Sequence, residues 1–158
     1  MVSLNDVHVK IGEVKVGIHG DLLKTTLGSC VGIAFVWKKK DLYALAHCLL
    51  PEAYEPTSVL GAKFVSQAIP SLMALLKVKP EDIKDIEVYI AGGANMMSQL
   101  SRKNVDHIGT LNLAAAKKYL VLNGFKFSEI DVGGEEGRQM LVDCNSGQVS
   151  VSRFQKAR

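Results

Sequence analysis

The sequence LGSCVGIAFVWKKKDLYALAHCLLP, residues 27–51, contains two apolar runs separated by a short charged segment. The first run, 31–37, ends at the charged residues 38–41, and the second, 42–50, ends at Pro51. Apolar runs that flank a short polar turn are typical of a β-hairpin, and proline cannot continue a central strand. We therefore predict two antiparallel strands joined by a turn at 38–41.

The register of this hairpin decides whether a cysteine and a histidine come together. If the turn has an even number of residues, Gly32 opposes His47 and Cys30 opposes Leu49. Cys30 and His47 then share one face as diagonal neighbours, with their backbones about 7–8 Å apart. An odd turn would place the thiol and the imidazole on opposite faces, so the turn length tests this pairing.

A cysteine beside a histidine is an arrangement that supports nucleophilic catalysis. Imidazole accepts the thiol proton to give a thiolate, and the resulting imidazolium can protonate the leaving group. Backbone N–H groups at the bend of Gly28 and Ser29 can stabilise an oxyanion, and Thr25 or Thr26 can orient the imidazole. A catalytic thiol here is expected to have a pKa below the value of about 8.5 for free cysteine.

The alternative is that both residues are structural. A cysteine in an apolar strand is most often a packed core residue, and a histidine at a strand end is usually hydrogen-bonded there. Cys48 is predicted to lie on the face opposite to His47, and Cys144 lies beside a turn. The three cysteines contain no C-x-x-C spacing, so the sequence predicts neither a zinc site nor a disulfide scaffold.

Outside the hairpin, the pattern predicts more strands and two helices. Apolar runs, alternating or continuous, predict strands at 7–11, 14–18, 22–27, 86–91, 125–132, 138–144 and 148–154. Apolar spacings of three and four predict helices at 57–76 and 111–122, with Thr57 or Ser58 as the first N-cap. Pro70 is expected to kink or split the first helix. The order predicts an α+β fold with a helical layer on a mostly antiparallel sheet.

Composition and length exclude several classes of protein. The 158 residues include 19 Lys and Arg and 16 Asp and Glu, a net charge of +3 that argues against a dedicated nucleic-acid binder. The length fits a single domain over 1–158. Within it, Arg138 is expected to form a surface salt bridge. The longest apolar run, 31–37, is far shorter than the roughly 18 residues of a membrane span, and MVSLNDVHVK lacks a signal peptide's apolar region. We expect a cytoplasmic protein without direct membrane insertion.

Five ordered pieces of the chain carry a family resemblance. The string LGSCV at 27–31, followed by AHCLLP at 46–51, resembles the signature of the CheD family, the chemoreceptor glutamine deamidases of bacterial and archaeal chemotaxis. AGGANM at 91–96, IG-x-x-N at 108–112 and GGEEGR at 133–138 are similar to later blocks of that family, in the same order. Together these pieces extend over most of the chain.

The resemblance implies a fold and a site. The implied fold is an α/β/β layered sandwich, with a catalytic architecture similar to that of bacterial cytotoxic-necrotizing-factor toxins. Cys30 matches the family's nucleophile, His47 matches its general base, and a threonine completes the site. Thr25 fits the shorter of the family's threonine spacings, whereas Thr26 requires another deletion.

The resemblance also implies a reaction and partners. The protein is expected to convert specific glutamines to glutamate on the cytoplasmic helices of chemoreceptors, through a thioester and without a metal or organic cofactor. A CheC-type phosphatase is an implied partner. A second hypothesis from a different class is a non-catalytic interaction module that binds and regulates a CheC-type phosphatase.

Overall fold

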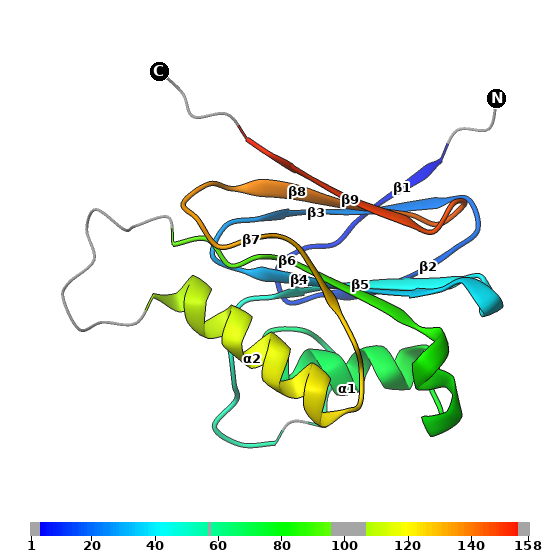
Figure 1. Cartoon of the computed structure of the whole chain (residues 1–158), viewed down its shortest axis with the longest axis horizontal. Helices are drawn as coiled ribbons and strands as arrows, with labels where there is room; N and C mark the ends of the chain where they lie inside the picture. The colour runs from blue at the N-terminus through cyan, green and yellow to red at the C-terminus, as the bar shows by residue number, and fades with distance from the viewer. Residues whose placement is uncertain (1–3, 57, 96–106, 155–158) are drawn as a thin grey trace.

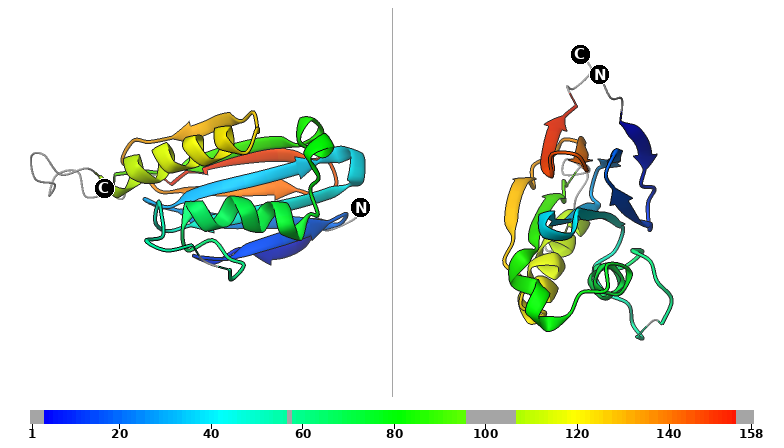
Figure 2. Two further views of the ribbon diagram at one scale, coloured as in Figure 1. Left: turned by 90° about the horizontal axis from the view of Figure 1, so that it is seen from below. Right: turned by 90° about the vertical axis from the view of Figure 1, so that its right-hand side faces the viewer.

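The computed structural model of the chain describes residues 4–56, 58–95 and 107–154 (Figure 1). Two β-sheets lie face to face, and two α-helices cover the outer face of one of them, as the turned views also show (Figure 2). This order of layers, helix, sheet and sheet, confirms the α/β/β sandwich that the family resemblance implies.

The helices and strands follow the predicted order. The strands are β1 (Asn5–His8), β2 (Val14–Ile18), β3 (Asp21–Leu27), β4 (Val31–Trp37), β5 (Leu42–Cys48), β6 (Glu87–Gly92), β7 (Ser128–Val132), β8 (Arg138–Asp143) and β9 (Gln148–Arg153). The helices are α1 (Val65–Leu75) and α2 (Ile108–Leu122), with short 3₁₀ helices at Lys38–Lys40 and Pro80–Asp85. Among the described residues, no helix has the length and apolar character that crossing a bilayer requires.

The two sheets are mixed but mainly antiparallel. One sheet has the strand order β1-β3-β8-β9, and the other has the order β2-β5-β4-β6-β7. Within them, β1 with β3 and β6 with β7 are parallel pairs, and the other neighbours are antiparallel. Apolar side chains fill two layers: Phe35 and Ile69 belong to the layer under the helices, and Leu23 and Met140 to the layer between the sheets.

The predicted hairpin forms β4 and β5, which are neighbours within the five-stranded sheet. Its turn consists of Lys38–Lys40 and Asp41, an even number of residues, and Asp41 adopts a left-handed backbone with φ of 52°. Gly32 pairs with His47, which confirms the predicted register. Every residue of β4 is buried because one of its faces meets the helices and the other meets the second sheet.

The first helix differs from its prediction. It begins well after Ser58, because the segment before it is held extended by a parallel bridge between Leu50 and Phe64. Thr57, the other predicted N-cap, lies outside the described residues. Pro70 does not split α1. Its exposed ring removes one backbone hydrogen bond, and the surrounding turns keep the helix continuous.

Candidate active site

Three of the sequence-predicted site residues lie in the layer between the sheets. His47 lies on β5, Thr25 lies on β3 of the other sheet, and Cys30 immediately precedes β4. Their exposed fractions are only 3%, 1% and 6%. Cys30 packs in the same apolar cluster as Leu45, which shares its face of β5 with His47. Both side chains therefore point away from the helices and into the layer between the sheets.

The hydroxyl of Thr25 connects His47 to the second sheet. Its Oγ1 lies 2.6 Å from Nδ1 of His47 and 2.5 Å from the carbonyl oxygen of Val9. Because the Val9 carbonyl can only accept, the single hydroxyl proton goes to Val9, and Nδ1–H of His47 donates to Oγ1. This arrangement leaves Nε2 without a proton, as a general base requires. Nε2 is buried and has no hydrogen-bond partner among the described residues.

The structure separates the two threonines. Successive residues on a strand point to opposite faces, so Thr26 is exposed while Thr25 is buried. Of the two, Thr25 is the residue within hydrogen-bonding distance of His47. The geometry therefore favours Thr25 as the residue that orients the imidazole.

Burial keeps the candidate nucleophile and base uncharged. Desolvation raises the pKa of the Cys30 thiol, against a smaller opposing effect of its own backbone N–H. This direction is opposite to the lowered pKa that would favour a preformed catalytic thiolate. Burial also lowers the pKa of His47, helped by His8 and opposed by the hydrogen bond toward Val9. Both shifts favour the uncharged forms, a thiol at Cys30 and a neutral imidazole at His47.

The other two cysteines occupy different surroundings. Cys48 is completely buried in the layer under the helices, on the face of β5 opposite to His47, as predicted. Cys144 lies between the sheets, where burial raises its pKa to about 12. Burial also raises the pKa of Cys48. Neither thiol is hydrogen-bonded to an imidazole in the described residues, and Cys30 is not bonded to His47 either, since Nδ1 bonds to Thr25 and Nε2 has no partner.

Three consecutive carbonyl groups anchor the segment that carries Cys30. The carbonyls of Gly28 and Cys30 accept hydrogen bonds from the backbone N–H groups of residues 93–94, at 3.0 and 2.8 Å. The carbonyl of Ser29 accepts from Nδ2 of Asn112 at 3.0 Å. In a trans peptide the N–H points opposite to the preceding carbonyl, so the N–H groups that follow point away from these anchors.

The loop after β6 approaches the Cys30 segment too closely for a side chain. Gly92 has a φ of 96°, and a Cβ there would overlap the carbonyl oxygen of Cys30. The carbonyl of Gly92 accepts from the N–H of Gly133 at 2.9 Å, which connects this loop to the one after β7. The two glycine-rich loops thus support each other beside Cys30. Met96, the last residue of AGGANM, lies outside the described residues.

Arg138 is completely buried, so the expected surface salt bridge is wrong. Its guanidinium donates to the carbonyls of Gly92 at 3.1 Å and Asp131 at 2.6 Å, and also to the carbonyl of Gly133. The Asp131 carboxylate lies 4.0 Å from it and forms a bidentate pair with Arg153. Arg138 therefore holds the two glycine-rich loops together from inside the protein.

Sequence reasoning missed Asn112 and Arg138 as parts of the site's support. Asn112 lies on the same face of α2 as the buried residues Ala115 and Ala116, three and four positions further on. Arg138 begins the alternating buried face of β8 that continues at Met140. In both cases, a polar residue at an apolar position of the pattern is the sequence feature that marks it.

A cavity of about 510 Å³ leads from the surface to His47. Its lining consists of His8, Val9, Lys10, Ile11, Thr25, Thr26 and His47. A ligand in this cavity would therefore lie beside His47 and Thr25. Within the described residues, no group of three or more His, Cys, Asp or Glu side chains is placed to hold a metal ion.

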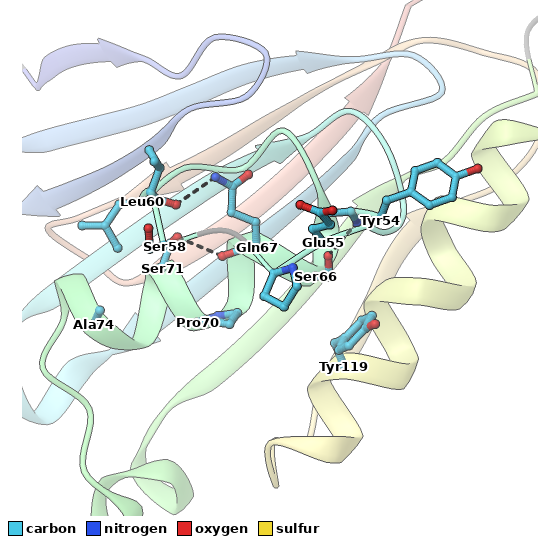
Figure 3. Close-up of a pocket in the computed structure, with 13 residues that line it drawn as sticks. Tyr54, Glu55, Ser58, Leu60, Ser66, Gln67, Pro70, Ser71, Ala74 and Tyr119 are labelled. Carbon is cyan, nitrogen blue, oxygen red and sulfur yellow. Dashed lines mark hydrogen bonds between the residues drawn. The ribbon is translucent and has the colours of Figure 1, made fainter.

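A second cavity, of about 570 Å³, lies on the helical side of the molecule (Figure 3). It is bordered by the loop before α1, by α1 itself and by Tyr119 of α2. Its polar groups bond to one another: Gln67 Nε2 donates to the Val59 carbonyl at 2.9 Å, and Ser71 Oγ donates to the Gln67 carbonyl at 2.8 Å. None of the sequence-predicted site residues lines it.

Comparisons with known proteins agree on one family. The family model described as CheD chemotactic sensory transduction matches residues 49–153. A Bdellovibrio bacteriovorus protein named probable chemoreceptor glutamine deamidase CheD is 36% identical, over 94% of this chain and 95% of that protein. A Ruegeria sp. protein named probable chemoreceptor glutamine deamidase CheD 2 is 31% identical, over 97% of this chain and 94% of that protein. A Methanococcus vannielii protein named probable chemoreceptor glutamine deamidase CheD is 33% identical, over 92% of this chain and 93% of that protein.

One solved structure, Neisseria meningitidis protein NMB0706, is similar with a TM-score of 0.47 and 13% identity, over 85% of this chain and 62% of that one. The family match begins after Cys30 and His47, but an alignment over 94% of the chain includes both positions. The resemblance seen in the sequence is confirmed, and this chain belongs to the CheD family.

Proposed function

We propose that this protein hydrolyses the side-chain amide of specific glutamines on the cytoplasmic helices of chemoreceptors, giving glutamate and ammonia. The observation that carries the proposal is the buried chain from the Val9 carbonyl through Thr25 to His47, which leaves Nε2 free in the same layer as Cys30. The names of the whole-chain relatives support the same activity. We place the reaction in the cytoplasm, where thiols remain reduced.

In the proposed mechanism, Nε2 of His47 removes the thiol proton while the sulfur of Cys30 bonds to the amide carbon. Burial disfavours both charged forms, which couples the two events. The N–H groups of the Ser29–Cys30 segment stabilise the oxyanion. His47 then returns the proton to the departing ammonia, and a thioester remains. Water, deprotonated by His47, hydrolyses the thioester to glutamate and restores the thiol.

The cavity beside His47 supplies the route for the substrate. A glutamine side chain projecting from a receptor helix enters between the residues that follow β1 and the exposed Thr26. It first meets Thr25 and His47; Cys30 does not line this cavity, so the proposal requires the amide to pass beyond His47 to reach the sulfur. Lys10 at this rim adds a positive charge that favours receptor segments with acidic residues beside the glutamine.

A direct test uses the purified protein and a cytoplasmic receptor fragment. Deamidation releases ammonia and raises the mass of each modified glutamine by about 1 Da, as mass spectrometry of the fragment detects. Conversion at defined glutamines supports the proposal. No conversion, together with saturable binding of a CheC-type phosphatase, would instead support the interaction-module hypothesis, which the buried and protonated state of Cys30 favours.

Replacing Thr25 with valine is expected to lower kcat by about 10- to 100-fold, because the imidazole loses the acceptor that fixes its tautomer. Thr25→Ser retains the hydroxyl and is expected to retain most of the activity. Thr26→Val changes an exposed residue and is expected to leave kcat within about twofold. Steady-state ammonia release by the three variants checks this. A larger loss of kcat in Thr26→Val than in Thr25→Val would show that Thr26, and not Thr25, orients the imidazole.

The rate of deamidation is expected to rise with pH and to reach half its maximum below pH 6.5, because only neutral His47 accepts the thiol proton. Burial lowers the pKa of His47 from 6.5, so the acidic limb lies on the acid side of that value. The same shift contributes stability that is present above pH 6.5 and lost as the pH falls through the folded-state pKa of His47.

Initial rates between about pH 5 and pH 8 measure this limb. The variant His8→Gln removes the electrostatic effect of His8 that lowers the pKa of His47, so its limb is expected to move toward higher pH. A limb centred at or above about pH 7 in the wild type would contradict a buried, neutral base.

A further inference from the structure

Asn112 connects the nucleophile segment to the strand of the base from the helical side. Its Nδ2 lies 3.0 Å from the carbonyl oxygen of Ser29 and 3.0 Å from that of Leu49. The side chain is completely buried. Ser29 directly precedes Cys30, and Leu49 lies two residues after His47. One carboxamide thus bonds to both segments that must bring sulfur and imidazole together.

The carboxamide of Asn112 lies just beyond the last backbone-paired residues of the hairpin. The last pair between β4 and β5 is Val31 with Cys48. Beyond it, the N–H of Leu49 turns away and donates to the carbonyl of Lys63 at 3.2 Å. The two hydrogens of Asn112 Nδ2 each satisfy one carbonyl at the next step along the hairpin. These two hydrogen bonds take the place of a backbone pair that the hairpin no longer forms at this step.

The same side chain carries a cost that packing alone does not explain. Oδ1 of Asn112 is buried and has no hydrogen-bond partner among the described residues. An unpaired buried polar atom is unfavourable, and α2 presents buried alanines on the same face. The donors of Asn112 therefore serve a purpose that an apolar side chain of similar size would not serve.

We infer that Asn112 is a positioning residue, whose bonds to the Ser29 and Leu49 carbonyls set the separation between Cys30 and His47. Asn112 itself does not touch the reacting atoms, since its bonds are to backbone carbonyls on the helical side of the hairpin. The inference rests on the proposed function and names the element that holds its nucleophile and base in register. A misplacement of about 1 Å in such a site can lower the rate by about 100-fold.

The first experiment compares Asn112→Leu with Asn123→Leu. The control is matched because Asn123, at the other end of α2, also donates its Nδ2 to a carbonyl, that of Tyr119, at 2.7 Å. Asn112→Leu is expected to lower kcat by about 10- to 100-fold with KM within about twofold, whereas Asn123→Leu changes neither. Equal kcat in both variants and the wild type would overturn the inference.

A second measurement needs no receptor and so separates this inference from the proposed function. The rate of alkylation of Cys30 by iodoacetamide, read by mass spectrometry, is compared between wild type and His47→Gln, with an expected ratio of at least about tenfold. In the Asn112→Leu background this ratio is expected to fall close to one, because the imidazole no longer reaches the thiol. In the Asn123→Leu background the ratio is expected to persist.

A ratio that persists in folded Asn112→Leu would show that Asn112 is structural only, whatever its effect on thermal stability. If Asn112→Leu does not fold, Asn112→Asp takes its place, because it has the same shape and presents acceptors where the two donors were. An alkylation ratio close to one in the Asn112→Leu background, combined with no ammonia release by the wild type, would support the positioning role of Asn112 and overturn the proposed deamidase function.

Discussion

Cys30→Ala is expected to abolish deamidation, with ammonia release falling by at least about 10³-fold. In the proposed mechanism the sulfur of Cys30 forms the thioester, and neither of the other two thiols is placed to replace it. Cys48 lies in the other apolar layer, and the pKa of Cys144 is raised to about 12 by burial. The variant is expected to fold, because a shortened side chain at this small residue removes only one atom from the layer between the sheets.

Mass spectrometry of a co-expressed receptor measures the effect, since each converted glutamine gains about 1 Da. Cys144→Ala is the matched control: it removes a buried thiol from the same inter-sheet cluster without removing the nucleophile. It is expected to convert the same glutamines as the wild type. Conversion by Cys30→Ala at the wild-type rate would remove the basis of the proposed mechanism.

Arg138→Met is expected to lower the free energy of unfolding by about 3–5 kcal/mol. The buried guanidinium satisfies three backbone carbonyls, those of Gly92, Asp131 and Gly133, and methionine fills similar space without donors. The Asp131 carboxylate also loses a nearby positive charge. Since a domain is stable by only about 5–15 kcal/mol, this loss is a large fraction of the total.

Arg153→Met is the control for this prediction. Arg153 pairs with the same carboxylate, but its side chain is 40% exposed, so solvent screens the pair and its loss is expected to lower the free energy of unfolding much less than the loss of Arg138. Urea unfolding followed by the fluorescence of Trp37, the single tryptophan, measures both variants. Similar losses in the two would mean that the bonds to the three carbonyls do not carry the stability.

The hairpin was predictable because its parts agree locally. Two apolar runs, an even polar turn and a terminal proline specify one register, and the structure has that register. The start of α1 was not predictable from periodicity, because Phe64, directly before it, is held by an isolated bridge to Leu50, beyond the end of β5. The single domain over 1–158 stays a prediction.

The candidate site was predictable in part for the same reason. Cys30 and His47 follow from the register of neighbouring strands, but Thr25 lies on the other sheet, and no local pattern specifies how two sheets pack. The protonation of Cys30 also depends on that packing, which is why its pKa moves opposite to the expectation. Arg138 was misjudged from its charge, although the alternation of β8 points it inward beside Met140.

The neutral state of Cys30 affects how readily its sulfur is oxidised. Peroxides attack thiolates rather than thiols, and a sulfenic acid at the nucleophile would block the site. If Cys30 is the nucleophile as proposed, a buried sulfur that keeps its proton until the amide arrives is expected to react slowly with peroxide between turnovers. The proposed mechanism then depends on each incoming amide to draw the proton from the sulfur.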